Sequence, residues 1–337
     1  MRQQPNQSAL LRRLDNLRIG NVTRKDWEEI NQRCYDNLSP EEKKNFDDET
    51  SDVICLTETW KEANCYNRSV LNSKYHNNER VVNAEFKSTG YGKHHNTAKE
   101  SLLQIPNKTV IAVGCRVILT RNQGCMTRLG SNNGAIGTVI SIIYKPNVKP
   151  PQMPEIVIVD FPRYKGPVWD EHQPTWVPIT ANIVTCEDVK KCCKRTGFPL
   201  ITGYAITIAK SQGMTIGPNQ QVTNVIIKLS SETTMEQLNC GTSYTAFSRV
   251  TQDEDWCLAE SEPFSRLEYL NRNPQLKLRK EEEKRLQNLS AKTKSENMCS
   301  IEQYLQLLRE VDSFCDDGIY DANCTVPNCS KCVIHKN

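Results

Sequence analysis

The sequence predicts an α/β fold that contains a β-rich insertion and ends in a charged helical and cysteine-rich tail. An apolar run at Val53–Leu56 leads directly into a capped helix, and a strand followed by a helix is the repeating unit of α/β folds. Short β-rich runs without intervening helices begin at Val110, and alternating strand and helix signals return at Leu200. The insertion therefore divides one α/β domain into two sequence segments.

The size and charge of the chain fit a protein of two domains and a tail. Its 337 residues exceed what a single hydrophobic core usually fills. Its formal net charge is only +3, so any contact with nucleic acid has to come from local basic patches.

The sequence shows no signal for a membrane or for secretion. No apolar run approaches the roughly 18 residues of a membrane span, and the N-terminal sequence MRQQPNQS lacks the apolar region of a signal peptide. The 15 cysteines are an odd number at irregular spacing, which favours reduced thiols over a disulfide framework. We therefore expect an intracellular protein that is neither secreted nor bound to a membrane.

Helix signals precede and follow the first predicted strand. In the segment 9–19, leucines at 10, 11, 14 and 17 repeat at the spacing of one helix face. Pairs of residues in capping-box positions mark the starts of three further helices. These pairs are Thr23 with Asp26, Ser39 with Glu42, and Thr59 with Glu62.

Four β-rich runs predict that the insertion is a small barrel or sandwich. The runs are short, they are separated by Gly, Pro and Asn clusters, and no helical pattern lies between them. They are VIAVGCRVILTRN, NGAIGTVISIIY, EIVIVDF and TWVPIT.

The composition changes to charged residues after Pro263. We predict a mixed-charge helical run, LKLRKEEEKRLQNL, then a linker at 292–297 and an amphipathic helix at Met298–Val311.

The last residues combine thiols and an imidazole at short spacing. Such a set could close a tetrahedral zinc site, and an unstructured thiol-rich end without metal is the alternative. The residues concerned are Cys324, Cys329, Cys332 and His335.

The most specific pattern lies in Thr202–Ile216, TGYAITIAKSQGMTI, and in Thr242–Val250, TSYTAFSRV. The first segment gathers hydroxyl groups around a lysine and a glycine, which suits phosphate groups better than a core. The two segments resemble the last two motifs of superfamily-one DNA helicases of the Pif-one type, YAxTxHKSQGxT and YxALSR. Ala209 stands in place of the histidine of this pattern, and Phe247 in place of its leucine.

Three other segments extend the resemblance to about residues 1–270. The sequence LTETWKEANCYN resembles hxxTNxxVxxxN, with Thr59 and Asn67 matching and Trp60 in place of an asparagine. The first two β-rich runs resemble GxRVxLxxN…NGxxGxV, and the N-terminal MRQ resembles NMRQ.

The resemblance implies the second RecA-like motor domain of a helicase, with an inserted small β-barrel of the Src-homology-three kind. Residues 1–104 would form the first part of that motor domain and 105–185 the barrel. Residues 195–270 would form the remainder with the last two motifs, and 271–337 a charged linker, an amphipathic helix and the Cys/His tail.

The resemblance also assigns roles to residues. Arg2 and Arg249 would stabilise charge on the γ-phosphate of ATP, with a surface salt bridge as the alternative for each. Gln212 and Gly213 would lie close to the nucleotide. The residues implied in DNA binding are Thr59, Asn67, Thr207, Lys210 and Ser211.

No G-x-x-x-x-G-K-[ST] phosphate loop occurs in the sequence. In such helicases this loop and the Mg²⁺ ligand belong to the first motor domain. We therefore expect the chain to need a phosphate-loop-bearing first domain, in cis or in trans, for ATP and Mg²⁺. The resemblance then implies the C-terminal motor half of an ATP-dependent 5′→3′ DNA helicase, which binds single-stranded DNA and is inactive as an ATP hydrolase alone.

The same resemblance implies roles in DNA repair and recombination and a nuclear location, with the mitochondrion as the alternative. It also allows an origin from a Helitron-type transposon. The competing hypothesis is a non-enzymatic DNA-binding or partner-binding remnant of a transposon-derived helicase.

Overall fold

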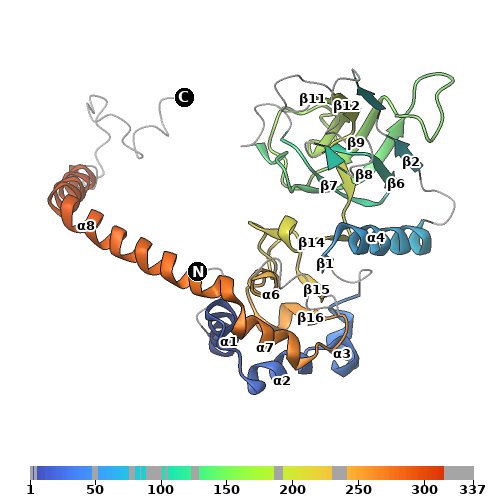
Figure 1. Cartoon of the computed structure of the whole chain (residues 1–337). Helices are drawn as coiled ribbons and strands as arrows, with labels where there is room; N and C mark the ends of the chain where they lie inside the picture. Colours follow the sequence, from blue (N-terminus) through green and yellow to red (C-terminus); the bar gives the residue numbers. More distant parts are fainter. Residues whose placement is uncertain are drawn as a thin grey trace. The chain divides into compact units, whose positions relative to one another are not determined.

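The computed structural model describes residues 3, 6–47, 52–75, 80–83, 85–88, 101–102, 105–122, 129–185, 193–229 and 241–314. The chain divides into two units, Met1–Asn273 and Pro274–Asn337. The first unit contains the strands and the candidate site, and the second contains one long helix (Figure 1).

A four-stranded parallel sheet forms the centre of the α/β part of the first unit (Figure 1). Its order is β14 (Ala205–Thr207), β1 (Val53–Thr57), β15 (Asn224–Lys228) and β16 (Trp256–Leu258). All five residues of β1 are buried, as expected for a parallel strand covered on both faces. The predicted α/β fold is confirmed, and the strands of its sheet are parallel.

Short helices surround this sheet, and their starts follow the local sequence. The capping boxes predicted at Thr23, Ser39 and Thr59 all form, each with the carboxylate three residues later. The helices are α1 (Ser8–Ile19), α2 (Arg24–Gln32), η1 (Tyr35–Asn37), α3 (Pro40–Lys44), α4 (Trp60–Lys74), η3 (Ala209–Ser211), α6 (Thr242–Phe247), η4 (Asp253–Asp255) and α7 (Phe264–Arg272).

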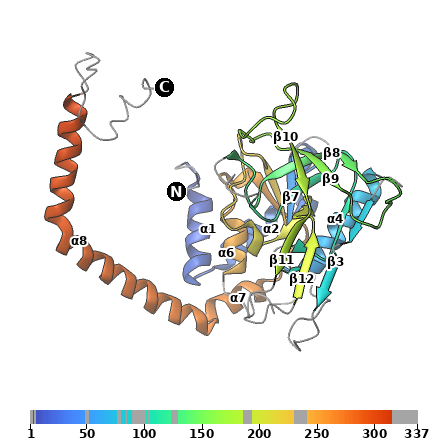
Figure 2. The ribbon, with the colours of Figure 1, turned by 90° about the horizontal axis from the view of Figure 1, so that it is seen from above.

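A five-stranded antiparallel sheet forms the largest part of the β-rich segment (Figure 2). Its order is β10 (Trp176–Thr180), β9 (Ile156–Asp160), β8 (Ile136–Ile143), β7 (Arg116–Leu119) and β13 (Leu200–Thr202). Since β13 ends just before β14 begins, the β-rich segment reaches residue 202 and leads directly into the parallel sheet.

The remaining strands form three small antiparallel sheets. One contains β11 (Asn182–Thr185), β12 (Cys193–Gly197) and β3 (Glu85–Ser88). The others pair β2 (Arg80–Asn83) with β6 (Lys108–Ile111), and β4 (Ser101–Leu102) with β5 (Ile105–Pro106).

The β-rich segment is attached to α4 and to β1 by packing and hydrogen bonds. Leu71 of α4 is part of the hydrophobic core of the β-rich segment. The Tyr75 hydroxyl, just after α4, donates to the Gly114 carbonyl at 2.8 Å. The Arg116 guanidinium donates to the Val53 carbonyl at the start of β1. These contacts fix the β-rich segment over α4.

The second unit contains α8 (Pro274–Phe314), a continuous helix that includes the predicted linker at 292–297. The linker prediction is wrong, because no glycine or proline interrupts the helical sequence there and Lys292 Nζ lies 3.7 Å from Glu296 Oε1 one turn later. Among the described residues, no helix combines the length and the apolar character that crossing a bilayer requires.

Candidate nucleic-acid interface

The carboxyl ends of β1 and β14 lie side by side at one edge of the parallel sheet, with Thr57 paired to Thr207. Open α/β sheets bind their ligands at this edge. The chain continues from β1 into α4 and from β14 into η3. These elements contain the five residues that the sequence implies in DNA binding.

The Thr59 hydroxyl takes part in the capping box of α4. It donates to Glu62 Oε2 at 2.7 Å and accepts from the Glu62 backbone N–H at 3.3 Å. Thr59 therefore sets where α4 begins, at the edge of the sheet where β1 ends.

Asn67 joins α4 to β14 through its amide group. The side chain is 6% exposed, and its Nδ2 donates to the Ala205 carbonyl at 2.9 Å. Its Oδ1 accepts from the backbone N–H groups of Tyr204 at 3.0 Å and Ala205 at 2.8 Å. These bonds place Asn67 in a positioning role, since they hold the strand that leads into η3.

The turn after β14 is held by its own hydroxyl groups. Thr207 Oγ1 accepts from the Lys210 backbone N–H at 3.3 Å, and the fully buried Ser211 hydroxyl donates to the Ile208 carbonyl at 2.7 Å. Gln212 and Gly213 follow on the surface, and Gly213 has a φ of +87°, which glycine adopts at little cost.

Lys210 extends from this turn to the β-rich segment. Its Nζ donates to Asn133 Oδ1, and the Asn133 backbone N–H donates to Asn122 Oδ1 at 2.8 Å. Partial burial lowers the pKa of Lys210 from its ordinary value. The Lys210 side chain therefore connects the α/β part of the first unit to the β-rich segment, and it contributes a partly desolvated positive charge.

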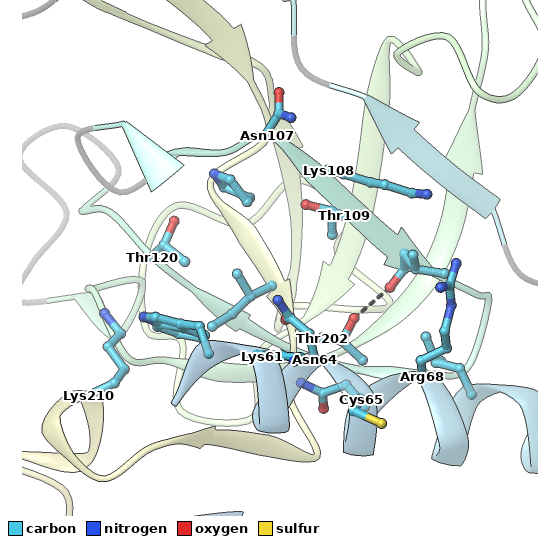
Figure 3. A pocket seen from close by; sticks show the side chains of 16 residues that line it. Lys61, Asn64, Cys65, Arg68, Asn107, Lys108, Thr109, Thr120, Thr202 and Lys210 are labelled. Atoms are coloured by element: carbon cyan, nitrogen blue, oxygen red, sulfur yellow. Dashed lines mark hydrogen bonds between the residues drawn. The ribbon is translucent and has the colours of Figure 1, made fainter. Parts of the chain in front are cut away.

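A pocket of about 1080 Å³ lies between α4 and the β-rich segment, and we call it the α4 pocket (Figure 3). One wall consists of residues from α4, and the opposite wall mainly of residues from β5, β6 and β13. Thr120, just after β7, and Lys210, on η3, complete the lining. The lining residues are Trp60, Lys61, Asn64, Cys65, Asn67, Arg68, Leu71, Pro106, Asn107, Lys108, Thr109, Val110, Thr120, Ile201, Thr202 and Lys210.

The α4 pocket is strongly biased toward positive charge. Four of its lining residues are cationic, and none of the described lining residues is an aspartate or a glutamate. Figure 3 shows Lys210 at one end of the pocket, Arg68 at the other and Lys108 on the wall opposite α4. Although the chain as a whole is nearly neutral, this surface can therefore attract a polyanion.

Sequence reasoning identified Lys210 and Asn67 but missed most of the α4 pocket. The missed signal was the second face of α4, where Trp60, Asn64 and Arg68 recur at i, i+4 and i+8 and are exposed. The facing strands could not be predicted as its neighbours, because they come from the β-rich segment.

A buried ionic cluster lies next to the capping residue Thr59. The Arg266 guanidinium, on α7, donates to the Glu58 carboxylate, and its Nη1 lies 4.0 Å from Glu262 Oε2. All three side chains are less than 10% exposed. Burial raises the pKa of Glu262 to about 7 against the attraction of Arg266, because the charged form loses hydration.

Arg249 lies just after α6, close to the turn that follows η3. Its Nε donates to the Thr245 carbonyl at 2.8 Å and its Nη2 to the Ser248 hydroxyl at 2.7 Å. The Gln3 amide donates to the carbonyls of Ser248 and Val250 at 3.2 and 3.1 Å. Gln3 therefore lies beside the segment that contains Arg249, whereas Arg2 itself lies outside the described residues.

The described residues contain no group of three or more His, Cys, Asp or Glu side chains placed to hold a metal ion. The predicted zinc ligands Cys324, Cys329, Cys332 and His335 lie outside the described residues, so zinc there stays a prediction.

Comparison with known proteins gives matches among solved structures. No protein-family profile and no curated protein sequence matches the chain. Its fold, which includes the parallel sheet described above, is similar to that of Pif1 helicases.

The similarity covers most of this chain and about half of each Pif1 helicase. The Candida albicans Pif1 helicase is 20% identical with a TM-score of 0.57, over 79% of this chain and 56% of that one. The Bacteroides Pif1 helicase in complex with ADP-AlF3 and ssDNA is 18% identical with a TM-score of 0.52, over 78% of this chain and 51% of that one. In a structure of two coordinating Pif1 helicases at forked dsDNA, the helicase is 18% identical with a TM-score of 0.53, over 79% of this chain and 50% of that one.

Proposed function

We propose that this chain is the C-terminal motor half of an ATP-dependent 5′→3′ DNA helicase and that it binds single-stranded DNA in the α4 pocket. The proposal includes a barrel of the Src-homology-three kind in the β-rich segment, near the predicted boundaries 105–185. A nuclear location, roles in DNA repair and recombination, and a Helitron-type transposon origin belong to the same proposal.

The observation that carries the proposal is the charge of the α4 pocket. Four cationic side chains face a space bounded by two structural layers, and no described lining residue has a carboxylate to oppose them. Phosphate contacts supply most of the sequence-independent affinity for nucleic acid. In support, similar Pif1 structures are described as bound to ssDNA.

In this proposal the implied DNA residues divide into two roles. Lys210 contacts a phosphate directly, because the residue lines the α4 pocket and its ammonium group, which donates to Asn133 Oδ1, has three N–H donors. The amide of Asn67 and the hydroxyls of Thr59, Thr207 and Ser211 hold α4 and η3 in place, since each is hydrogen-bonded within the fold.

The proposed nucleotide site lies beside α6. Arg249 and Arg2 would stabilise charge on the γ-phosphate, and the exposed turn at Gln212 and Gly213 would face the nucleotide. These residues would contact only the γ-phosphate of ATP. The other parts of the nucleotide and Mg²⁺ would therefore be bound by a first motor domain with a phosphate loop. When bound, ATP supplies the free energy for stepping along DNA.

Salt-dependent binding of a labelled oligothymidine to the full chain tests the proposal. Each neutralised phosphate of a single strand contributes about −0.7 to the slope of log K against log salt concentration. We expect Lys210→Ala to weaken binding at low salt and to make the slope less negative by about 0.7. The matched control is Lys145→Ala, since Lys145 is exposed and does not line the α4 pocket.

Two results would contradict the proposal. One is affinity that does not depend on salt. The other is an equal loss of affinity in the Lys210→Ala and Lys145→Ala variants, because a general loss of charge would then explain the effect.

A further inference from the structure

The α4 pocket contains an aromatic side chain for which the fold has no evident use. Trp60 is the first residue of α4, it is 38% exposed, and it lines the pocket. The buried face of the same helix consists of Ala63, Asn67 and Leu71. The indole of Trp60 is not part of this buried face, since Trp60 is one of the exposed large hydrophobic residues.

Two other tryptophans show how this fold uses an indole for structure. Trp27 donates from Nε1 to the Glu262 carbonyl at 2.7 Å and packs edge-on against Phe264. Trp256 donates from Nε1 to Asp253 Oδ1 at 2.9 Å and packs edge-on against Phe247.

Trp60 has neither kind of partner. Among the described residues, none accepts a hydrogen bond from its indole N–H, and no ring or cation stacks on its face. A large aromatic surface therefore stays open inside a cationic pocket.

We propose that Trp60 stacks on a base of single-stranded DNA whose phosphates contact the cations of the α4 pocket. The inference rests on the proposed function and adds a binding residue to the same site. Every base has a π-face, so stacking on an indole tolerates any sequence and adds affinity that does not depend on salt.

The arrangement along α4 supports this assignment. Trp60, Asn64 and Arg68 form one stripe of the helix, at i, i+4 and i+8, and all three line the pocket. Along this stripe, the indole ring of Trp60, the amide of Asn64 and the guanidinium of Arg68 follow one another at intervals of four residues. Aromatic rings next to a cationic track are the combination with which proteins hold single strands without reading their sequence.

The charges at the two ends of the α4 pocket also suit a polymer. Cationic side chains lie at both ends (Figure 3). A strand could therefore pass through with a phosphate near each end and a base at the indole of Trp60, which also lines the pocket.

The test compares the full chain with the variants Trp60→Ala, Trp60→Phe and Trp169→Ala, using labelled oligothymidine and an abasic strand of equal length. Trp169 is the matched control, because it is 56% exposed and does not line the pocket. We expect Trp60→Ala to weaken oligothymidine binding at least about fivefold, which corresponds to the ~1 kcal/mol lower limit for a stacked base. Trp60→Phe should retain most of the affinity, and Trp169→Ala all of it.

Two further readouts separate stacking from a change in fold or in charge. The salt slope of Trp60→Ala should equal that of the wild type, because no phosphate contact is lost. On the abasic strand, wild type and Trp60→Ala should bind equally.

The outcomes distinguish this inference from the function on which it rests. Salt-dependent binding that Lys210→Ala weakens and Trp60→Ala leaves unchanged would overturn the stacking role alone. Equal losses for Trp60→Ala on the abasic strand and on oligothymidine would also overturn it, because no base would then be involved. If the wild type binds no single-stranded DNA, the stacking role and the proposed function both fail.

Discussion

At the scale of single residues, Asn67 shows how one amide can connect two distant parts of the chain. Its oxygen accepts from two backbone N–H groups of the segment entering β14, and its nitrogen donates to the Ala205 carbonyl. These groups lie at the start of β14, and the η3 turn that contains Lys210 follows directly after that strand. The position of the proposed phosphate contact therefore depends on a residue that is itself buried.

We predict that Asn67→Ala destabilises the protein by about 1–3 kcal/mol, because the buried N–H groups of Tyr204 and Ala205 lose their side-chain acceptor. Urea unfolding of the full chain measures the change. Asn64→Ala is the matched control, since Asn64 is exposed on the same helix and should stay within about 0.5 kcal/mol of the wild type. Equal effects of the two substitutions would refute the positioning role.

At the scale of elements, α7 is joined to the start of α4 through the buried cluster of Glu58, Arg266 and Glu262. One arginine faces two carboxylates, and the bond to Glu58 is the closer contact. Glu262 has its pKa raised to about 7 by burial. The folded protein therefore retains a proton on Glu262 at pH values where the unfolded chain has lost it.

This difference makes the stability of the cluster depend on pH. Between the ordinary pKa of 4.5 and about 7, raising the pH favours the unfolded state, because only that state has released the proton. We predict that Glu262→Gln removes this loss, because glutamine does not titrate. The free energy of unfolding of the variant minus that of the wild type should therefore increase between about pH 5 and pH 8. Denaturant unfolding at the two pH values provides the measurement.

The variant Glu171→Gln is the control, because Glu171 is exposed and is not among the groups that shift the pKa of Glu262. It should follow the pH dependence of the wild type. A constant difference between Glu262→Gln and the wild type at both pH values would show that Glu262 does not titrate in this range.

Elements that depend on local sequence could be predicted, and those that depend on distant partners could not. The capping boxes at Thr23, Ser39 and Thr59 were predicted because cap and carboxylate lie three residues apart. The partners of Asn67 lie about 138 residues further along the chain, so no local pattern indicates them. The linker prediction at 292–297 took a polar sequence for a loop, although no glycine or proline interrupts it and its two lysines and its glutamate are good helix formers.

The same distinction applies to the candidate site. The Lys210 motif could be found from the sequence because its residues are contiguous. The α4 pocket could not, since its two walls come from α4 and from strands of the β-rich segment that only the folded chain brings together.

At the scale of the whole molecule, the proposal divides the catalytic work between this chain and a first motor domain. We predict that the 337-residue chain alone shows no ATP hydrolysis stimulated by single-stranded DNA, because its sequence contains no phosphate loop. Supplying a phosphate-loop-bearing first motor domain, fused or in trans, should restore hydrolysis, and Arg249→Ala should abolish the restored activity. Release of inorganic phosphate is the measurement.

Hydrolysis by the chain alone that Arg249→Ala abolishes would contradict this division of work, since it would reveal a complete nucleotide site within these residues. Hydrolysis that survives Arg249→Ala in the reconstituted protein would contradict the role of Arg249.

The position of β1 has a consequence for how the protein folds during synthesis. β1 is the only described strand of the parallel sheet that precedes the β-rich segment, and its neighbours β14 and β15 both follow that segment. During synthesis on the ribosome, this apolar strand stays unpaired until the β-rich segment and then β14 and β15 have been synthesised. Pairings between such distant segments form slowly and leave strands open to aggregation meanwhile. A chain that stops before Ala205 would therefore expose β1 permanently.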